Sequence, residues 1–135
     1  MPRASRTEGF LVIGVGIDLV ELPRVKAILE RWGDRVLDKV LAPEERESLP
    51  AAPAARAEAL ARAIALKEAA SKAIGTGWSR GVRWRDVAVR LGPEPSIRLT
   101  GAAAAVARSL GANGGATASI EVRGPLVLGQ VHLLG

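Results

Sequence analysis

The segment Ala65-Leu-Lys-Glu-Ala-Ala-Ser-Lys-Ala-Ile-Gly-Thr-Gly77 decides how the rest of the chain is read. Its residue types favour a helix up to Gly75, where Gly75-Thr76-Gly77 supplies a flexible stop. At about 100° per residue, Lys67, Glu68 and Lys72 gather in one sector of an otherwise apolar helix. The simple interpretation is an ordinary Glu-to-Lys pair four residues apart. The sharper one is a metal carboxylate, two phosphate-binding lysines and a loop that leaves room for a ligand. This helix alone does not decide between them.

Length and composition indicate a small single-domain protein and exclude some kinds of site. The 135 residues suit one domain with its own core. Hydrophobic residues make up 48% and aromatics only 3%, so Ala, Val, Leu and Ile must build that core. The chain has no cysteine, which excludes disulfides and cysteine-ligated metals. No apolar run approaches the roughly 20 residues of a membrane span, and we expect a soluble, cytoplasmic protein without a membrane partner.

The net charge of +5 favours acidic partners: nucleic acid, phosphorylated small molecules or an acidic protein. The basic residues are spread along the chain. They form no Lys/Arg cluster and no aromatic-interleaved strand of the kind typical of RNA-binding domains. A small basic nucleic-acid-binding protein therefore stays a distant alternative.

The first part of the chain predicts a tail followed by a buried strand. Residues 1–9 read as a flexible tail, and residues 10–135 as a single domain. The run from Phe10 to Ile17 is apolar and β-branched, as in a buried strand, and its two glycines indicate close approach of another backbone. Asp18 follows directly, at a position where a carboxylate often only caps the next helix.

Turn residues and hydrophobic periodicity predict the remaining elements. Helices are expected from Pro23 to Trp32, from Asp34, from Pro43, through the long segment quoted above and from Ala102 to Leu110; strands are expected around Val87–Leu91, at Ile97–Leu99, up to Val122 and over Leu126–Leu134. This order is not a repeating strand–helix–strand pattern. It predicts an α+β fold, with an antiparallel sheet, a long central helix and smaller helices packed on one face.

Two motifs, in this order and spacing, resemble those of the holo-acyl-carrier-protein synthases, the small phosphopantetheinyl transferases. Val15-Gly-Ile-Asp-Leu-Val-Glu-Leu-Pro-Arg-Val25 resembles the family's N-terminal motif G-[IV]-D-[IL]-V-E-x-x-R-[IV]. Lys67-Glu-Ala-Ala-Ser-Lys-Ala-Ile-Gly-Thr-Gly77 resembles its central motif K-E-A-x-x-K-A-x-G-T-G. Leu41-Ala-Pro-Glu-Glu45 and Pro95-Ser-Ile-Arg-Leu-Thr-Gly101 are similar to two further family patterns. The resemblance covers roughly residues 12–122.

The resemblance implies a magnesium-dependent transferase of fatty acid biosynthesis. A serine hydroxyl of apo acyl carrier protein attacks the β-phosphate of coenzyme A, phosphopantetheine moves to the serine, and 3′,5′-ADP leaves. Asp18 and Glu68 are implied to be the catalytic metal ligands, since Mg²⁺ on a pyrophosphate needs only a few protein oxygens. Lys72 is implied to contact the phosphates or protonate the leaving group, and Glu68, or a water held by the metal, to take the serine proton.

Further residues are implied to bind the two substrates. The implied coenzyme-binding residues are Lys67, Lys72, Gly75, Thr76, Gly77, Pro95 and Ser119. Arg24 is implied to meet the acidic helix of the carrier protein, which the positive net charge suits. The resemblance to the short members of the family also implies a homotrimer with active sites at the subunit interfaces.

The chain departs from the family pattern near the implied coenzyme site. The late strand of the family often reads S-[IL]-S-H, whereas Ala118-Ser-Ile-Glu-Val-Arg123 has no histidine after the serine. Arg123 is a candidate substitute cation, and His132 lies too far along to be the counterpart. The turn Gly92-Pro-Glu-Pro95 lacks the usual lysine. The main alternative is thus a relative that binds coenzyme A or carrier protein without turnover, although such a protein needs no pair of metal carboxylates.

Overall fold

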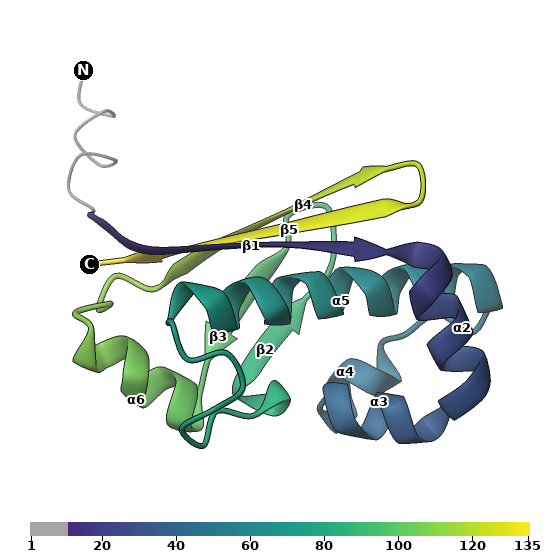
Figure 1. Ribbon diagram of the computed structural model, residues 1–135, viewed down its shortest axis with the longest axis horizontal. Helices are drawn as coiled ribbons and strands as arrows, with labels where there is room; N and C mark the ends of the chain where they lie inside the picture. The colour runs from purple at the N-terminus through teal and green to yellow at the C-terminus, as the bar shows by residue number, and fades with distance from the viewer. Residues whose placement is uncertain (1–10) are drawn as a thin grey trace.

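The computed structural model describes residues 11–135, so the predicted tail at 1–9 and the residue Phe10 lie outside the described part. One long helix is enclosed by a sheet on one side and by smaller helices and a hairpin on the other (Figure 1). The elements are β1 (Val12–Glu21), α2 (Leu22–Trp32), α3 (Asp34–Val40), α4 (Pro43–Glu47), α5 (Pro53–Ala73), the 3-10 turn η1 (Trp84–Asp86), β2 (Val87–Arg90), β3 (Ser96–Leu99), α6 (Gly101–Ser109), β4 (Ala116–Arg123) and β5 (Leu126–Leu134). The predicted α+β class is confirmed.

The strands form two antiparallel sheets where we expected one. The first has the order β1-β5-β4, and the second is the hairpin β2-β3. In the first sheet the two ends of the described part of the chain pair with each other, since β1 runs antiparallel to β5 along its whole length. A hairpin signal in the sequence specifies which neighbours pair, but not whether two hairpins join edge to edge. The sequence therefore predicted the strands, but not that they form two separate sheets.

Strand β1 is longer than predicted, and Asp18 lies inside it rather than at its end. The pairing with β5 continues past Asp18, which faces Gly129, to Glu21 opposite Leu126. Helix α2 starts after Glu21, and no side chain caps its N-terminus. The capping role that we considered for Asp18 is therefore wrong. Leu19 and Val20 extend the apolar strand pattern, which explains the additional pairs.

Glycines let α5 lie directly on the sheet. A Cβ added at Gly16 of β1 would stand 1.8 Å from the carbonyl oxygen of Ala69, and one at Gly129 of β5 would stand 2.7 Å from the backbone of Ala65. Both alanines are fully buried. This confirms the close backbone approach that the strand glycines indicated, and it fixes where α5 crosses β1.

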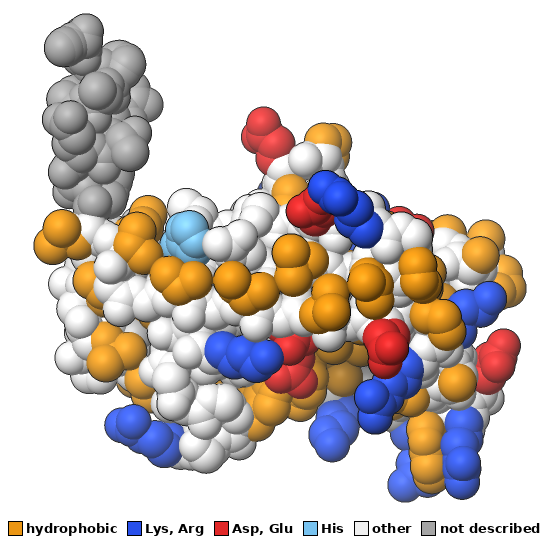
Figure 2. Space-filling model, turned by 45° about the horizontal axis from the view of Figure 1, so that its top comes forward, with side chains coloured by type: hydrophobic (Ala, Val, Ile, Leu, Met, Phe, Trp, Pro, Cys, Tyr) orange, Lys and Arg blue, Asp and Glu red, His pale blue; other side chains and the backbone are white. Residues whose placement is uncertain are grey.

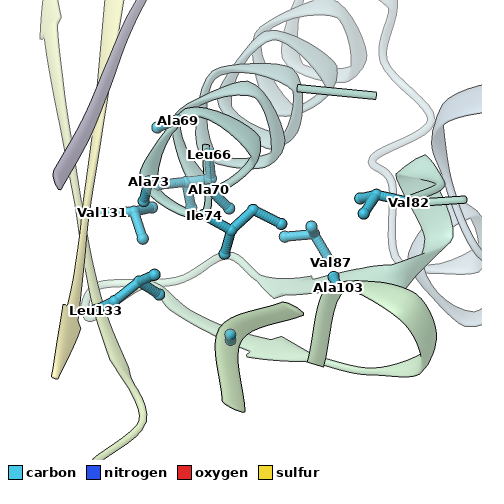
Figure 3. Packing of buried hydrophobic residues seen from close by; sticks show 11 residues of the cluster. Leu66, Ala69, Ala70, Ala73, Ile74, Val82, Val87, Ala103, Val131 and Leu133 are labelled. Carbon is cyan, nitrogen blue, oxygen red and sulfur yellow. The ribbon is translucent and has the colours of Figure 1, made fainter. Parts of the chain in front are cut away.

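The core continues on the far side of α5. Leu66 and Ala70 of α5, together with Ile74 directly after it, pack with Val87 of β2 and Leu133 of β5 in one buried cluster (Figure 3). A second cluster joins the N-terminal half of α5 to α2 and α3. Each buried leucine or valine contributes about 1.5–3 kcal/mol relative to exposure, so α5 is held from nearly all sides. Among the described helices, none combines the length and the apolar composition needed to cross a bilayer.

Candidate active site

An ion pair joins the two sequence motifs at the crossing of β1 and α5. Asp18 alternates along β1 with the buried residues Gly16 and Val20, so its side chain faces the helix. Lys72, in the last turn of α5, donates a hydrogen bond of 2.7 Å to Oδ1 of Asp18. It donates a second, longer bond of 3.3 Å to the carbonyl oxygen of Ile17. The simple Glu68–Lys72 helix pair is thus replaced by a contact across the fold.

The charges of Asp18, Glu68 and Lys72 act on one another. The hydrogen bond from Lys72 to Asp18 raises the pKa of the lysine above its ordinary value, and the negative charge of Glu68 acts in the same direction. The Lys72 side chain is 51% exposed and that of Asp18 is 17% exposed. The amine of Lys72 is thus paired with Asp18 and lies within electrostatic reach of Glu68 at the edge of solvent.

These carboxylates have the chemistry of a magnesium site. Glu68 is partly exposed, and neither of its side-chain oxygens accepts a hydrogen bond from another of residues 11–135. Mg²⁺ commonly binds through one or two protein carboxylates together with substrate phosphates. No cluster of three or more His, Asp or Glu side chains occurs in the described part of the chain, so an all-protein cage is absent there. Asp18 and Glu68 fit a metal that completes its shell with phosphate and water.

The glycine loop begins at Gly75, three residues after Lys72, and turns back on the end of α5. The amide of Gly75 donates to the carbonyl oxygen of Lys72 at 3.0 Å, and the amide of Gly77 donates to that of Ser71 at 3.1 Å. Both glycines have positive φ, 85° and 57°, a conformation that L side chains rarely adopt. A Cβ at either position would meet no atom within 4 Å. The loop therefore presents open backbone beside the charged cluster.

Lys67 is not part of this cluster, which corrects its expected role as a coenzyme phosphate contact. Its side chain is fully buried. Its Nζ donates to the carbonyl oxygens of Trp84 at 2.9 Å and Val87 at 2.6 Å, and pairs with Oε1 of Glu45 at 3.0 Å. The one-residue step from Glu68 turns Lys67 by about 100°, toward β2 instead of the solvent. Sequence periodicity alone could not reveal which neighbour covers that side of the helix.

The remaining predicted site residues lie apart from the cluster. Ser119 is exposed on the outer face of the first sheet, in the row Ser119–Gln130–Ile17, whereas Asp18 faces inward. Pro95 precedes β3 in the second sheet. Arg24 is exposed in the first turn of α2. A single chain therefore brings together Asp18, Glu68, Lys72 and the glycine loop, but not Ser119.

A groove of about 1010 Å³ lies between α4, the first half of α5 and the β2–β3 hairpin. Its lining includes Arg62, Arg90 and Arg98, together with Gly92 and Ser96, which flank the turn that ends at Pro95. Sequence reasoning did not single out these arginines. Each of Arg90 and Arg98 alternates with apolar residues in one of two consecutive strands, and this alternation could have placed both arginines on one hairpin.

The outer face of the first sheet is apolar and open. Along β1, Val15, Ile17 and Leu19 are each about half exposed, at 49%, 50% and 57%. Figure 2 shows hydrophobic side chains in a row across this face. Large exposed apolar patches mark interaction surfaces.

Comparison with known proteins gives consistent matches. A family model described as the 4′-phosphopantetheinyl transferase superfamily matches residues 14–120. The holo-[acyl-carrier-protein] synthase of Alkalilimnicola ehrlichii is 43% identical over 106 residues, which cover 77% of this chain and 83% of that protein. An acyl carrier protein synthase of Plasmodium yoelii with ADP bound has a TM-score of 0.79 at 26% identity, covering 93% of this chain and 97% of the other. A holo-(acyl-carrier-protein) synthase of Bacillus anthracis in complex with CoA (3′,5′-ADP) has a TM-score of 0.69 at 28% identity, covering 92% and 97%.

Proposed function

This chain belongs to the holo-[acyl-carrier-protein] synthase family of the 4′-phosphopantetheinyl transferase superfamily, and we propose that it transfers 4′-phosphopantetheine from coenzyme A to a serine of apo acyl carrier protein. The observation that carries the proposal is the Asp18–Lys72 ion pair beside Glu68. These three side chains come from the two motifs with which the resemblance was identified. A relative without turnover would not need them at one surface point.

The proposed reaction is a phosphoryl transfer. The serine oxygen forms a bond to the β-phosphorus of coenzyme A, and the bond from that phosphorus to the bridging oxygen breaks. The 3′,5′-ADP leaves with the bridging oxygen, while the serine proton passes to Glu68 as general base. Lys72 donates a hydrogen bond to the leaving phosphate, and its raised pKa keeps it protonated at neutral pH. When bound, Mg²⁺ neutralises charge on the transferring and leaving oxygens, and Asp18 and Glu68 are the residues that would hold it.

We propose that coenzyme A lies from the glycine loop toward the groove. Gly75, Thr76 and Gly77 would run along the diphosphate, because their backbone is open beside Lys72. The arginines of the groove suit the anionic groups of the nucleotide, and Pro95 directly precedes Ser96, which lines the groove. Arg62 precedes Glu68 by six residues, about 9 Å along the helix axis, which an extended coenzyme can span.

We propose a homotrimer in which neighbouring subunits complete each site. The open apolar face of the first sheet supports a contact between copies, since a monomer would leave Val15, Ile17 and Leu19 in water. Ser119 lies on that same face. It would therefore contribute to the coenzyme site of an adjacent copy rather than to its own.

We propose that the carrier protein docks near the start of α2. Arg24 is exposed there, six residues after Asp18 in the chain. The net charge of +5 favours encounter with an acidic partner. In the cell the product would be holo acyl carrier protein for fatty acid biosynthesis in the cytoplasm.

The proposal is tested by following both products of the reaction. The protein is incubated with coenzyme A, Mg²⁺ and apo acyl carrier protein, and the nucleotides are separated by chromatography. We expect 3′,5′-ADP to form in step with holo carrier protein. A carrier variant with alanine in place of the acceptor serine is the control and should release none. Equal release of 3′,5′-ADP from both carriers would contradict transfer to the serine.

A further inference from the structure

The ammonium of Lys67 is the most completely bonded charged group in the interior of the described chain. It is fully buried, and three acceptors surround it: the carbonyl oxygens of Trp84 and Val87 and the carboxylate of Glu45. Burial lowers the pKa of Lys67, and the charge of Glu45 opposes that shift. Three acceptors match the three N–H donors of a charged ammonium, so the geometry around Lys67 suits its protonated form.

Glu45 is itself fixed, which makes the Lys67 contact rigid. Its Oε1 accepts a hydrogen bond from the amide of Ala42 at 2.8 Å, and its Oε2 accepts one from the amide of Val89 at 2.7 Å. The side chain of Glu45 is 9% exposed. Through this carboxylate, Lys67 of α5 is tied to the start of α4 and to β2.

The contact with Trp84 leads from Lys67 to the glycine loop. The Trp84 ring stacks on the ring of Trp78, with centroids 4.1 Å apart and planes 20° apart. The indole N–H of Trp78 is buried and has no hydrogen-bond partner among the described residues, so this ring is held by packing, on Trp84 and on the buried cluster beside α5. Trp78 follows Gly77 directly. The loop is thus held at its start by α5 and at its end by the stacked tryptophans.

We propose that Lys67 is a positioning residue that sets the Gly75–Gly77 loop through Trp84 and Trp78. The inference rests on the proposed function, because it assigns the loop to the coenzyme. Lys67 fixes the Trp84 carbonyl, Trp84 fixes Trp78 by stacking, and Trp78 fixes the end of the loop. Lys67 acts on the coenzyme only through these residues and never touches a phosphate.

The buried ion pair between Lys67 and Glu45 determines which variants can test the proposal. Replacing Lys67 alone would leave the Glu45 carboxylate buried without its counter-charge, a strongly destabilising change. The test therefore uses the double variant Lys67→Met/Glu45→Gln, which removes both charges and keeps similar volumes. Trp78→Ala removes the stack from the loop end of the same series of contacts. Trp78→Phe keeps an aromatic ring there and should restore the wild-type behaviour.

The experiment measures KM for coenzyme A in each variant and in their combination. Every assay uses the 135-residue chain with coenzyme A, Mg²⁺ and apo carrier protein. We expect Lys67→Met/Glu45→Gln and Trp78→Ala each to raise KM for coenzyme A by about tenfold, within the range of couplings in one network, with a smaller change in kcat. Each should also weaken the near-ultraviolet circular dichroism of the tryptophan pair. Together they should raise KM no further than either does alone. Trp32→Ala, on α2, is the matched control and should leave KM for coenzyme A unchanged.

Two outcomes would overturn the inference. If the effects on KM multiply in the combined variant, or if the Lys67 change leaves the tryptophan signal intact, Lys67 does not act through Trp78. The turnover of the wild type separates this failure from failure of the proposed function, because only the latter leaves the unaltered protein unable to modify the carrier protein. If Lys67→Met/Glu45→Gln does not fold, Trp78→Ala still tests the loop, and an unchanged KM in that variant would equally overturn the inference.

Discussion

The Asp18 carboxylate and the Lys72 ammonium meet at the protein surface, so removing either should affect function more than folding. A partly exposed ion pair contributes about 0–1 kcal/mol to stability. We therefore expect Asp18→Ala and Glu68→Ala each to abolish transfer and to shift the unfolding midpoint by only a few degrees. Turnover and thermal melts of the purified variants check this. Asp34→Ala is the matched control, since Asp34 also lies in an exposed ion pair, with Arg46, and its variant should keep full turnover.

A titration of Lys72 tests the geometry of the cluster directly. The hydrogen bond with Asp18 raises the pKa of Lys72, so Asp18→Asn should lower that pKa toward its ordinary value. A raised lysine pKa stabilises the folded state below the unfolded-state value of about 10.4. That contribution disappears as the pH rises through the higher folded-state pKa. The ¹³Cε chemical shift of Lys72 against pH measures the change, and identical titrations in both proteins would argue against the ion pair.

The residues of the site were predictable to different degrees. Asp18, Glu68 and Lys72 carry charge at fixed positions of two motifs, and the fold brings Asp18 and Lys72 into contact. Lys67 belongs to the same motif, but its role depends on Glu45 and on two backbone carbonyls. Those partners lie 17 to 22 residues away and come from elements whose docking no local pattern specifies. Ser119 and Pro95 stay predictions that need a second subunit or a bound coenzyme.

At the scale of elements, the crossing of β1 over α5 sets the distance between the motifs. Gly16→Ala would place a methyl group 1.8 Å from the Ala69 carbonyl oxygen, and the strand would have to move away from the helix. Overpacking of this kind costs about 1–3 kcal/mol, occasionally more. We expect a lower unfolding midpoint, measured by calorimetry, together with reduced turnover. Gly92→Ala, where a Cβ would meet no atom within 4 Å, is the control and should melt like the wild type.

Most elements followed from local sequence signals, whereas their assembly did not. The last strand was predicted from Leu126 to Leu134 and forms with those bounds, because alternating apolar residues follow a clear Gly-Pro turn. Helix α2 ends before Gly33, as expected from a glycine that adopts a φ of 49°. The pairing of β1 with β5 joins opposite ends of the chain. Patterns within a short segment of sequence do not predict such long-range pairing or the separation of the strands into two sheets.

At the scale of the whole molecule, the open face of the first sheet predicts self-association. Leu19→Glu would place a charge on this face, where the leucine is 57% exposed in the single chain. We expect the wild type to have three times the mass of one chain by light scattering and the variant to dissociate and lose turnover. Leu110→Glu changes a leucine of similar exposure, 50%, next to α6 and should stay trimeric. A wild type with the mass of one chain would contradict the shared sites.

We propose that Asp18, Glu68 and Lys72 together form the centre of a metal-dependent phosphopantetheinyl transfer. The most direct measurement is the intact mass of apo acyl carrier protein after incubation with the wild type, coenzyme A and Mg²⁺, repeated with chelator and with Glu68→Gln. We predict a gain equal to one phosphopantetheinyl group with the wild type, and none with chelator or with the variant. A carrier protein that gains no mass with the wild type, or the same mass with Glu68→Gln, would contradict this account.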